Sequence, residues 1–98
     1  MIKVIGVRTT NEKAEGGRNR QDILKEFFEA GNKKIIVNAE YDKLNNEIRI
    51  RSAKTNELLG SMCRKTTNSM MKKEDNPKQY VGIIDYHGYY YLKLVPKN

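Results

Sequence analysis

Short stretches that alternate apolar and polar residues limit what this chain can fold into. The clearest covers 47–52, where Ile48 and Ile50 point to one side of a predicted strand and Arg49 and Arg51 to the other. Further strands are predicted at 2–9, 34–38, 57–63, 79–86 and 89–95, with a polar loop at 40–46 and a turn at 55–56. Five or six short strands in 98 residues predict a small barrel or rolled sheet, because closure removes exposed strand edges.

Two segments have helical spacing instead. One covers about 20–30, with Asn19 as its N-cap and Gly31 just past its end. The apolar stripe that packs this helix on the barrel consists of Ile23, Leu24, Phe27 and Phe28. The other covers about 65–73 with Met70 and Met71 facing inward, and a polar, glycine-containing loop is expected at 10–17. The predicted class is mainly β with two helices (α+β), in a single domain, 1–98.

The last two predicted strands are joined by His87-Gly88, which indicates a tight two-residue hairpin. Pairing Tyr86 with Tyr89 gives two faces: Val81, Ile83, Leu92 and Leu94 on one, and Gly82, Ile84, Tyr86, Tyr89, Tyr91 and Lys93 on the other. An aromatic face beside basic groups is typical of proteins that bind single strands. The alternative is that these tyrosines cover a helix or close the end of the barrel.

The charge balance favours an anionic partner. Nineteen Lys and Arg residues against twelve Asp and Glu give a net charge of +7, and the basic residues occur in every segment. A basic folded surface of this kind fits nucleic-acid binding, and the alternative is that the lysines only keep a small protein soluble. One cysteine and no long apolar run lead us to expect a cytoplasmic protein with no membrane span.

Catalytic residues are poorly supplied. The one histidine, His87, lies in the predicted turn, and the one cysteine, Cys63, has no histidine nearby. A zinc site cannot be built from one Cys and one His. Asp42 and Glu47 come closest to a carboxylate pair for a metal-dependent nuclease, and their pattern disfavours it. We therefore expect no enzyme activity, no metal and no cofactor.

Four segments, in order, resemble the HIRAN domain, a module found alone in bacterial or phage-like contexts and at the N-terminus of certain eukaryotic remodelling ATPases. They are Val-Ile-Gly-Val-Arg at 4–8, Gly-Arg-Asn-Arg-Gln-Asp-Ile-Leu at 17–24, Asn-Ala-Glu-Tyr-Asp-Lys at 38–43 followed by Ile-Arg-Ile at 48–50, and Leu-Leu-Gly-Ser-Met-Cys-Arg-Lys at 58–65. The resemblance spans about residues 2–95. It departs from the family where Ala39-Glu40 replaces Asn-Pro, where two extra residues separate Asp42 from Ile48, where Thr9 replaces an aromatic residue and where Cys63 replaces a basic one.

The resemblance implies a six-stranded barrel of the OB or SH3-like kind that captures the 3′ end of single-stranded DNA. By position, Arg8 and Arg64 would contact phosphates, Tyr41 would stack on the terminal base, and Asp42 would accept a hydrogen bond from the 3′-hydroxyl. Thr9 and Tyr90 complete the implied nucleic-acid site, although the hairpin pairing favours Tyr89 or Tyr91 over Tyr90. The implied partners are single-stranded DNA and a helicase or nuclease encoded separately.

Alternatives stay open for these residues and for the whole chain. Tyr41 and Asp42 can simply build a turn, and Arg8 can be an ordinary surface residue. The chain can also be a protein-interaction module whose tyrosine-rich face docks a partner. Salt dependence separates the two functions, because phosphate contacts weaken steeply with salt.

Overall fold

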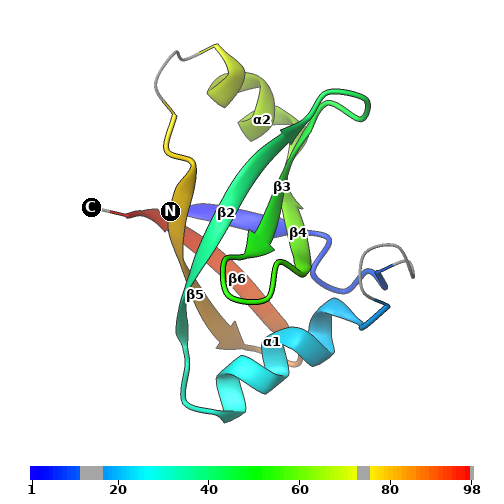
Figure 1. Ribbon diagram of the computed structural model, residues 1–98, viewed down its shortest axis with the longest axis vertical. Helices are drawn as coiled ribbons and strands as arrows, with labels where there is room; N and C mark the ends of the chain where they lie inside the picture. Colours follow the sequence, from blue (N-terminus) through cyan, green and yellow to red (C-terminus); the bar gives the residue numbers. More distant parts are fainter. Residues whose placement is uncertain (12–16, 73–75, 98) are drawn as a thin grey trace.

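The structure of this chain is a computed structural model that describes residues 1–11, 17–72 and 76–97. The strands close into one barrel in the order β1-β4-β3-β2-β5-β6, and each pair is antiparallel. Figure 1 shows the barrel with one helix at each end. The predicted class, a small six-stranded barrel with two helices, is confirmed.

The strands are β1 (Ile2–Ile5), β2 (Lys34–Asp42), β3 (Glu47–Ser52), β4 (Leu58–Met62), β5 (Gln79–Tyr86) and β6 (Tyr90–Pro96). The helices are α1 (Arg20–Glu29) and α2 (Arg64–Met71). Most of the loop expected at 10–17 lies outside the described residues. Neither helix is long and apolar enough to cross a membrane, as far as the described residues go.

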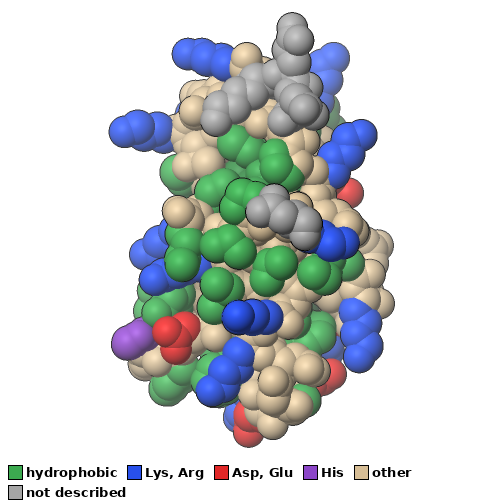
Figure 2. Space-filling view, turned by 90° about the vertical axis from the view of Figure 1, so that its left-hand side faces the viewer, with side chains coloured by type: hydrophobic (Ala, Val, Ile, Leu, Met, Phe, Trp, Pro, Cys, Tyr) green, Lys and Arg blue, Asp and Glu red, His purple; other side chains and the backbone are tan. Residues whose placement is uncertain are grey.

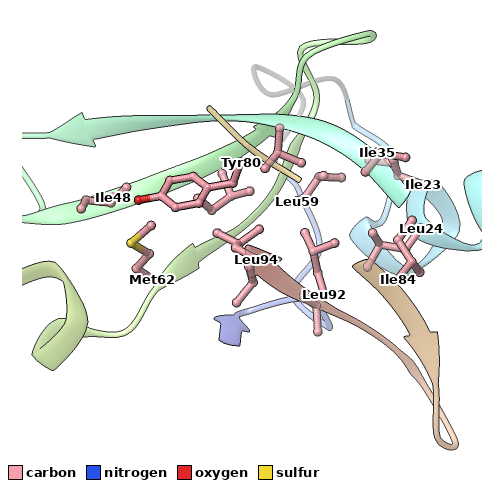
Figure 3. Close-up of a cluster of buried hydrophobic side chains, with 14 of the residues drawn as sticks. Ile23, Leu24, Ile35, Ile48, Leu59, Met62, Tyr80, Ile84, Leu92 and Leu94 are labelled. Carbon is pink, nitrogen blue, oxygen red and sulfur yellow. The ribbon is translucent and has the colours of Figure 1, made fainter. Parts of the chain in front are cut away.

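The core forms where alternate strand positions meet the apolar stripe of α1. Ile48 and Ile50 face inward, as predicted, because the strand period of two sends their arginine neighbours outward. From α1, Ile23 and Leu24 are fully buried. Phe27 and Phe28 pack against the same core and are half-buried, so the predicted stripe is confirmed. Figure 3 shows Ile23 and Leu24 at one end of this core and Met62 at the other.

The register of the last hairpin differs from the prediction by one residue. Tyr86 pairs with Tyr90, so the connecting loop has three residues, 87–89. A two-residue loop of the common type would need a left-handed backbone at both positions, and only Gly88 has one, at φ 76°. The inward residues of the hairpin are therefore Tyr80, Gly82, Ile84, Leu92 and Leu94, and Val81 and Ile83 face outward.

Three element boundaries also differ. β1 stops at Ile5 instead of continuing to residue 9, because Gly6 takes a left-handed φ of 75° and begins a turn. β2 continues through Asp42, since its polar end pairs fully with β3 and leaves only 43–46 as the loop. α2 ends at Met71, which is 47% exposed instead of facing inward.

Candidate nucleic-acid interface

Arg8 lies in the turn that follows β1, where Thr9 N–H donates to the Gly6 carbonyl at 3.1 Å. Its side chain is exposed, and its guanidinium carbon sits 5.2 Å from the centre of the Tyr89 ring. This contact joins the end of β1 to the loop of the β5–β6 hairpin. Arginine can contact phosphates and a tyrosine ring can stack on a base, so this pair supplies both kinds of contact to a nucleic acid.

The outward side chains of β6 continue this surface. Lys93 Nζ lies 5.3 Å from the centre of the Tyr91 ring. Lys93 also pairs across the strands with Lys3 of β1. We call the surface formed by Lys3, Arg8, Tyr89, Tyr91 and Lys93 the hairpin face. It holds two shallow hollows, of about 240 and 300 Å³, that share Lys3, Tyr89 and Tyr91.

Asp85 orients Tyr91 on this face. The Tyr91 hydroxyl donates to Asp85 Oδ2 at 3.1 Å. The pKa of Asp85 is lowered, chiefly by the hydrogen bond from the Tyr86 backbone N–H. Burial and the neighbouring carboxylate raise the pKa of Tyr91. The phenol is therefore neutral at physiological pH, and its ring is held by a carboxylate at the edge of the cationic surface.

Gln21 of α1 holds the two halves of the hairpin face together. Its Nε2 donates to the carbonyls of Val7 at 3.0 Å and Tyr90 at 2.6 Å. Its Oε1 accepts from the Tyr90 backbone N–H at 2.8 Å. Because Arg8 follows Val7 and Tyr89 precedes Tyr90, one amide side chain sets the positions of both.

The neighbouring Arg20 holds the same turn from the other side. Its Nη1 donates to the Gly6 carbonyl at 2.8 Å, and its Nε donates to Asn11 Oδ1 at 2.6 Å. Sequence reasoning treated Arg20 and Gln21 only as part of a family resemblance and missed this positioning role. No spacing signal connects Gln21 to a partner 69 residues away.

Tyr90 does not lie on the hairpin face. Its ring packs against Phe28 at 5.4 Å and Tyr86 at 4.8 Å between ring centres, on the inner side of the hairpin. Through Phe28 it covers α1, one of the two roles that the alternative interpretation gave the tyrosines. Thr9, in contrast, lines the same hollow as Arg8 and Tyr89.

Tyr41 and Asp42 lie at the end of β2. The Tyr41 hydroxyl donates to Asn46 Oδ1 at 2.8 Å. Asp42 accepts from the Leu44 N–H at 3.1 Å and from Asn45 Nδ2 at 2.6 Å. Its Oδ2 also forms an ion pair with Arg49 at 3.1 Å. The pKa of Asp42 is lowered, chiefly by the hydrogen bond from Asn45. These contacts are those of a turn-building carboxylate that stays ionised.

The structure therefore divides the predicted site residues between two places. Because β1 and β4 are antiparallel, with Ile5 opposite Ser61, Arg8 follows one end of this strand pair and Arg64 follows the other. Arg64 is exposed and begins α2. The Asp42 end of the barrel is on the α2 side, since Asn46 Nδ2 donates to Asn68 Oδ1 of α2 at 3.3 Å.

The fold and the hairpin face define a class of protein, a small closed β-barrel with aromatic and cationic side chains along one strand pair. Within the described ranges, no three His, Cys, Asp or Glu residues gather as metal ligands. Comparisons with models of known protein families, with curated proteins and with solved structures find no match.

Proposed function

We propose that this protein is a non-catalytic module that binds single-stranded nucleic acid, most simply DNA, on the hairpin face. The observation that supports it is the pairing of Arg8 with Tyr89 and of Lys93 with Tyr91 along one strand pair. Tyrosine rings can stack on any base, and the cations beside them can contact phosphates, although Tyr91 also stacks on His87 with ring centres 5.4 Å apart. Such a surface contacts the backbone and the bases but does not distinguish one base sequence from another.

The expected energies are moderate. Stacking on a tyrosine contributes about 1–3 kcal/mol per base. Each phosphate contact to a single strand changes the slope of log affinity against log salt by about −0.7. The hairpin face has three cations, so we expect a slope of about −2. A net charge of +7 speeds association without adding specificity.

Fluorescence anisotropy with a labelled poly-deoxythymidine strand tests this proposal. Tyr89→Leu and Tyr91→Leu should each weaken binding by about 5- to 100-fold, from the loss of one stacked base. The matched control is Tyr86→Leu, since Tyr86 belongs to the same hairpin, is 51% exposed and packs on its inner side. Binding of both test variants with the parent's affinity would refute the hairpin face as the interface.

A more specific form of the proposal is that Asp42 accepts the 3′-hydroxyl of the bound strand. A carboxylate offers about four lone-pair sites, and Asp42 already uses them on Leu44, Asn45 and Arg49, so the 3′-hydroxyl would replace one of these contacts. A strand that reaches both Arg8 and Asp42 would cross the outer face of β4 and β3. Ser61 and Arg49 lie between them there, in register with Ile5.

Asp42→Ala tests the end-reading form with two kinds of strand. Loss of a charge-assisted hydrogen bond of about 1.5–3 kcal/mol should weaken binding of a 3′-hydroxyl end, partly offset by lost repulsion. The same change should strengthen binding of a 3′-phosphate end, because a like-charge contact disappears. Parallel shifts for the two ends would refute end reading by Asp42 and leave the hairpin face untouched.

A protein-interaction module is the second candidate, and one observation favours it. Ile36, Val81 and Val95 lie opposite one another across β2, β5 and β6 on the outer face of the barrel. The adjacent row carries Lys34 and Lys93. Figure 2 shows apolar side chains gathered on this side, with basic ones around them. Two copies meeting here would oppose their lysines, so the partner this face fits is a protein with an acidic rim.

A peptide of alternating leucine and glutamate is a suitable probe for that second candidate. Val81→Ser should weaken its binding and leave oligonucleotide affinity unchanged, because the residue lies off the hairpin face. Equal peptide binding by the parent and by Val81→Ser would remove the candidate.

A further inference from the structure

A further hollow lies at the α2 end of the barrel, away from the hairpin face. Its volume is about 500 Å³, within the range of small-molecule sites, which often occupy the mouths of barrels. Its larger apolar and aromatic lining residues are Tyr41, Ile48, Met62, Met70, Met71 and Tyr80. They come from β2, β3, β4, α2 and β5, so the hollow is the mouth of the barrel beneath α2.

Tyr80 lines this hollow and carries a buried polar atom, its hydroxyl. The residue is 1% exposed, and its hydroxyl has no hydrogen-bond partner within residues 1–11, 17–72 and 76–97. Figure 3 shows the hydroxyl directed between Ile48 and Met62, both of which line the hollow. Burial raises the pKa of the phenol, so it is a neutral donor. A buried hydroxyl without a partner is rare in folded proteins and costly to keep.

We propose that this hollow binds a small, neutral, planar ring compound that carries one hydrogen-bond acceptor, with the acceptor directed at the Tyr80 hydroxyl. The site is distinct from the hairpin face, since it uses no phosphate contact and lies at the other end of the barrel from Gln21 and the hairpin loop. It lies at the same end as Asp42, whose neighbour Tyr41 lines it.

The lining fits this class of ligand. Three methionines surround the space, and thioether groups contact aromatic rings favourably at their edges. Methionine side chains also move readily, which allows a ring to reach a hydroxyl that Ile48 and Met62 cover. The charged groups at the rim do not call for a charged ligand, because Glu40 already pairs with Arg51 at 2.6 Å and Lys78 is exposed.

The test uses a matched pair of probes, acetophenone and α-methylstyrene, which differ only in C=O against C=CH₂. Both are titrated into protein with isotope-labelled methionine methyl groups. The chain has four methionines, of which Met62, Met70 and Met71 line the hollow and Met1 is 82% exposed elsewhere. Acetophenone should shift the three methyl signals of the hollow and leave that of Met1 in place.

The Tyr80→Phe variant then separates the contribution of the hydrogen bond to affinity from that of apolar contacts. In the parent, acetophenone should bind more tightly than α-methylstyrene. In Tyr80→Phe this preference, the ratio of the two affinities, should fall about tenfold, because one buried hydrogen bond is lost. Tyr86→Phe, which removes an exposed hydroxyl, should leave the ratio unchanged. Absence of the three methyl shifts at millimolar acetophenone, or an unchanged ratio in Tyr80→Phe, would overturn the proposal. Oligonucleotide binding is measured separately, so neither result depends on the other.

Discussion

Replacing Gln21 with alanine should damage both the stability of the fold and the binding of single strands. The side chain makes three hydrogen bonds, two to the Tyr90 backbone and one to the Val7 carbonyl. It is half-buried, so water replaces these bonds only in part. Each hydrogen bond contributes about 0.5–1.5 kcal/mol, so the free energy of unfolding should fall by about 2 kcal/mol when all three are lost.

The loss of single-strand affinity follows from the role of Gln21 in positioning Arg8 and Tyr89. Arg8 and Tyr89 neighbour the two backbone segments that Gln21 holds, and without it both must be ordered when the ligand binds. At about 0.5–1.5 kcal/mol for each side chain immobilised, affinity for a single strand should fall about tenfold. The Gln21→Ala variant should lower the affinity although Gln21 itself does not contact the strand.

Urea unfolding and fluorescence anisotropy measure the two effects. A loss of 2 kcal/mol corresponds to a decrease of roughly 8–16 °C in Tm for a domain of this size. Gln79→Ala is the matched control, because the Gln79 amide also makes hydrogen bonds, with the side chains of Asn38 at 2.9 Å and Lys97 at 3.1 Å, but is exposed. It should cost less than about 0.5 kcal/mol. Equal stability and equal affinity in the two variants would refute the role assigned to Gln21.

Three further predictions concern single side chains. Arg8→Ala should flatten the salt dependence of single-strand binding by about 0.7 in log–log slope, and an unchanged slope between low and moderate salt would exclude a phosphate contact by Arg8. Glu57, whose pKa is lowered chiefly by its hydrogen bond from Arg18, should contribute stability that is present above about pH 5 and lost as the pH falls through its folded pKa. Unfolding free energies of the parent should therefore fall more steeply in acid than those of Glu57→Gln, and parallel curves would contradict this. Tyr80→Phe should raise the free energy of unfolding by about 1 kcal/mol, whereas a decrease would show that the hydroxyl has a partner.

The barrel could be predicted from the sequence because its strands are short and their periods agree with burial. Two patterns indicate which side of each element is buried. They are the alternation around Ile48 and Ile50 and the α1 stripe that contains Ile23 and Leu24. These patterns are local, and closure of the sheet follows from the number and shortness of the strands.

The hairpin register could not be predicted, because it depends on one backbone angle. His87-Gly88 is compatible with a two-residue loop, but the chain keeps His87 out of the left-handed region and uses Tyr89 as a third loop residue. This shift of one residue reverses the faces of β5 relative to β6, so it sends Ile84 inward with Leu92 and Leu94 and turns Val81 and Ile83 outward.

The candidate site was predicted in part. The sequence indicated a cationic and aromatic surface, and Arg8 and Tyr89 do meet. The division of Arg8 from Tyr41 and Asp42 depends on strand order around the barrel, which no local pattern reports. The positioning by Gln21 depends on contacts between residues distant in sequence, for which a single chain gives no signal.

The most direct test of the central claim is an amide chemical-shift titration of the parent protein with a short poly-deoxythymidine strand. Binding on the hairpin face predicts that the largest shifts fall on the backbone amides around Arg8 and from Tyr89 to Lys93. Smaller or no shifts are expected over Ile36 and Val81, which lie outside the hairpin face. No shifts at any strand concentration, or shifts confined to residues away from Arg8 and Tyr89–Lys93, would contradict the account.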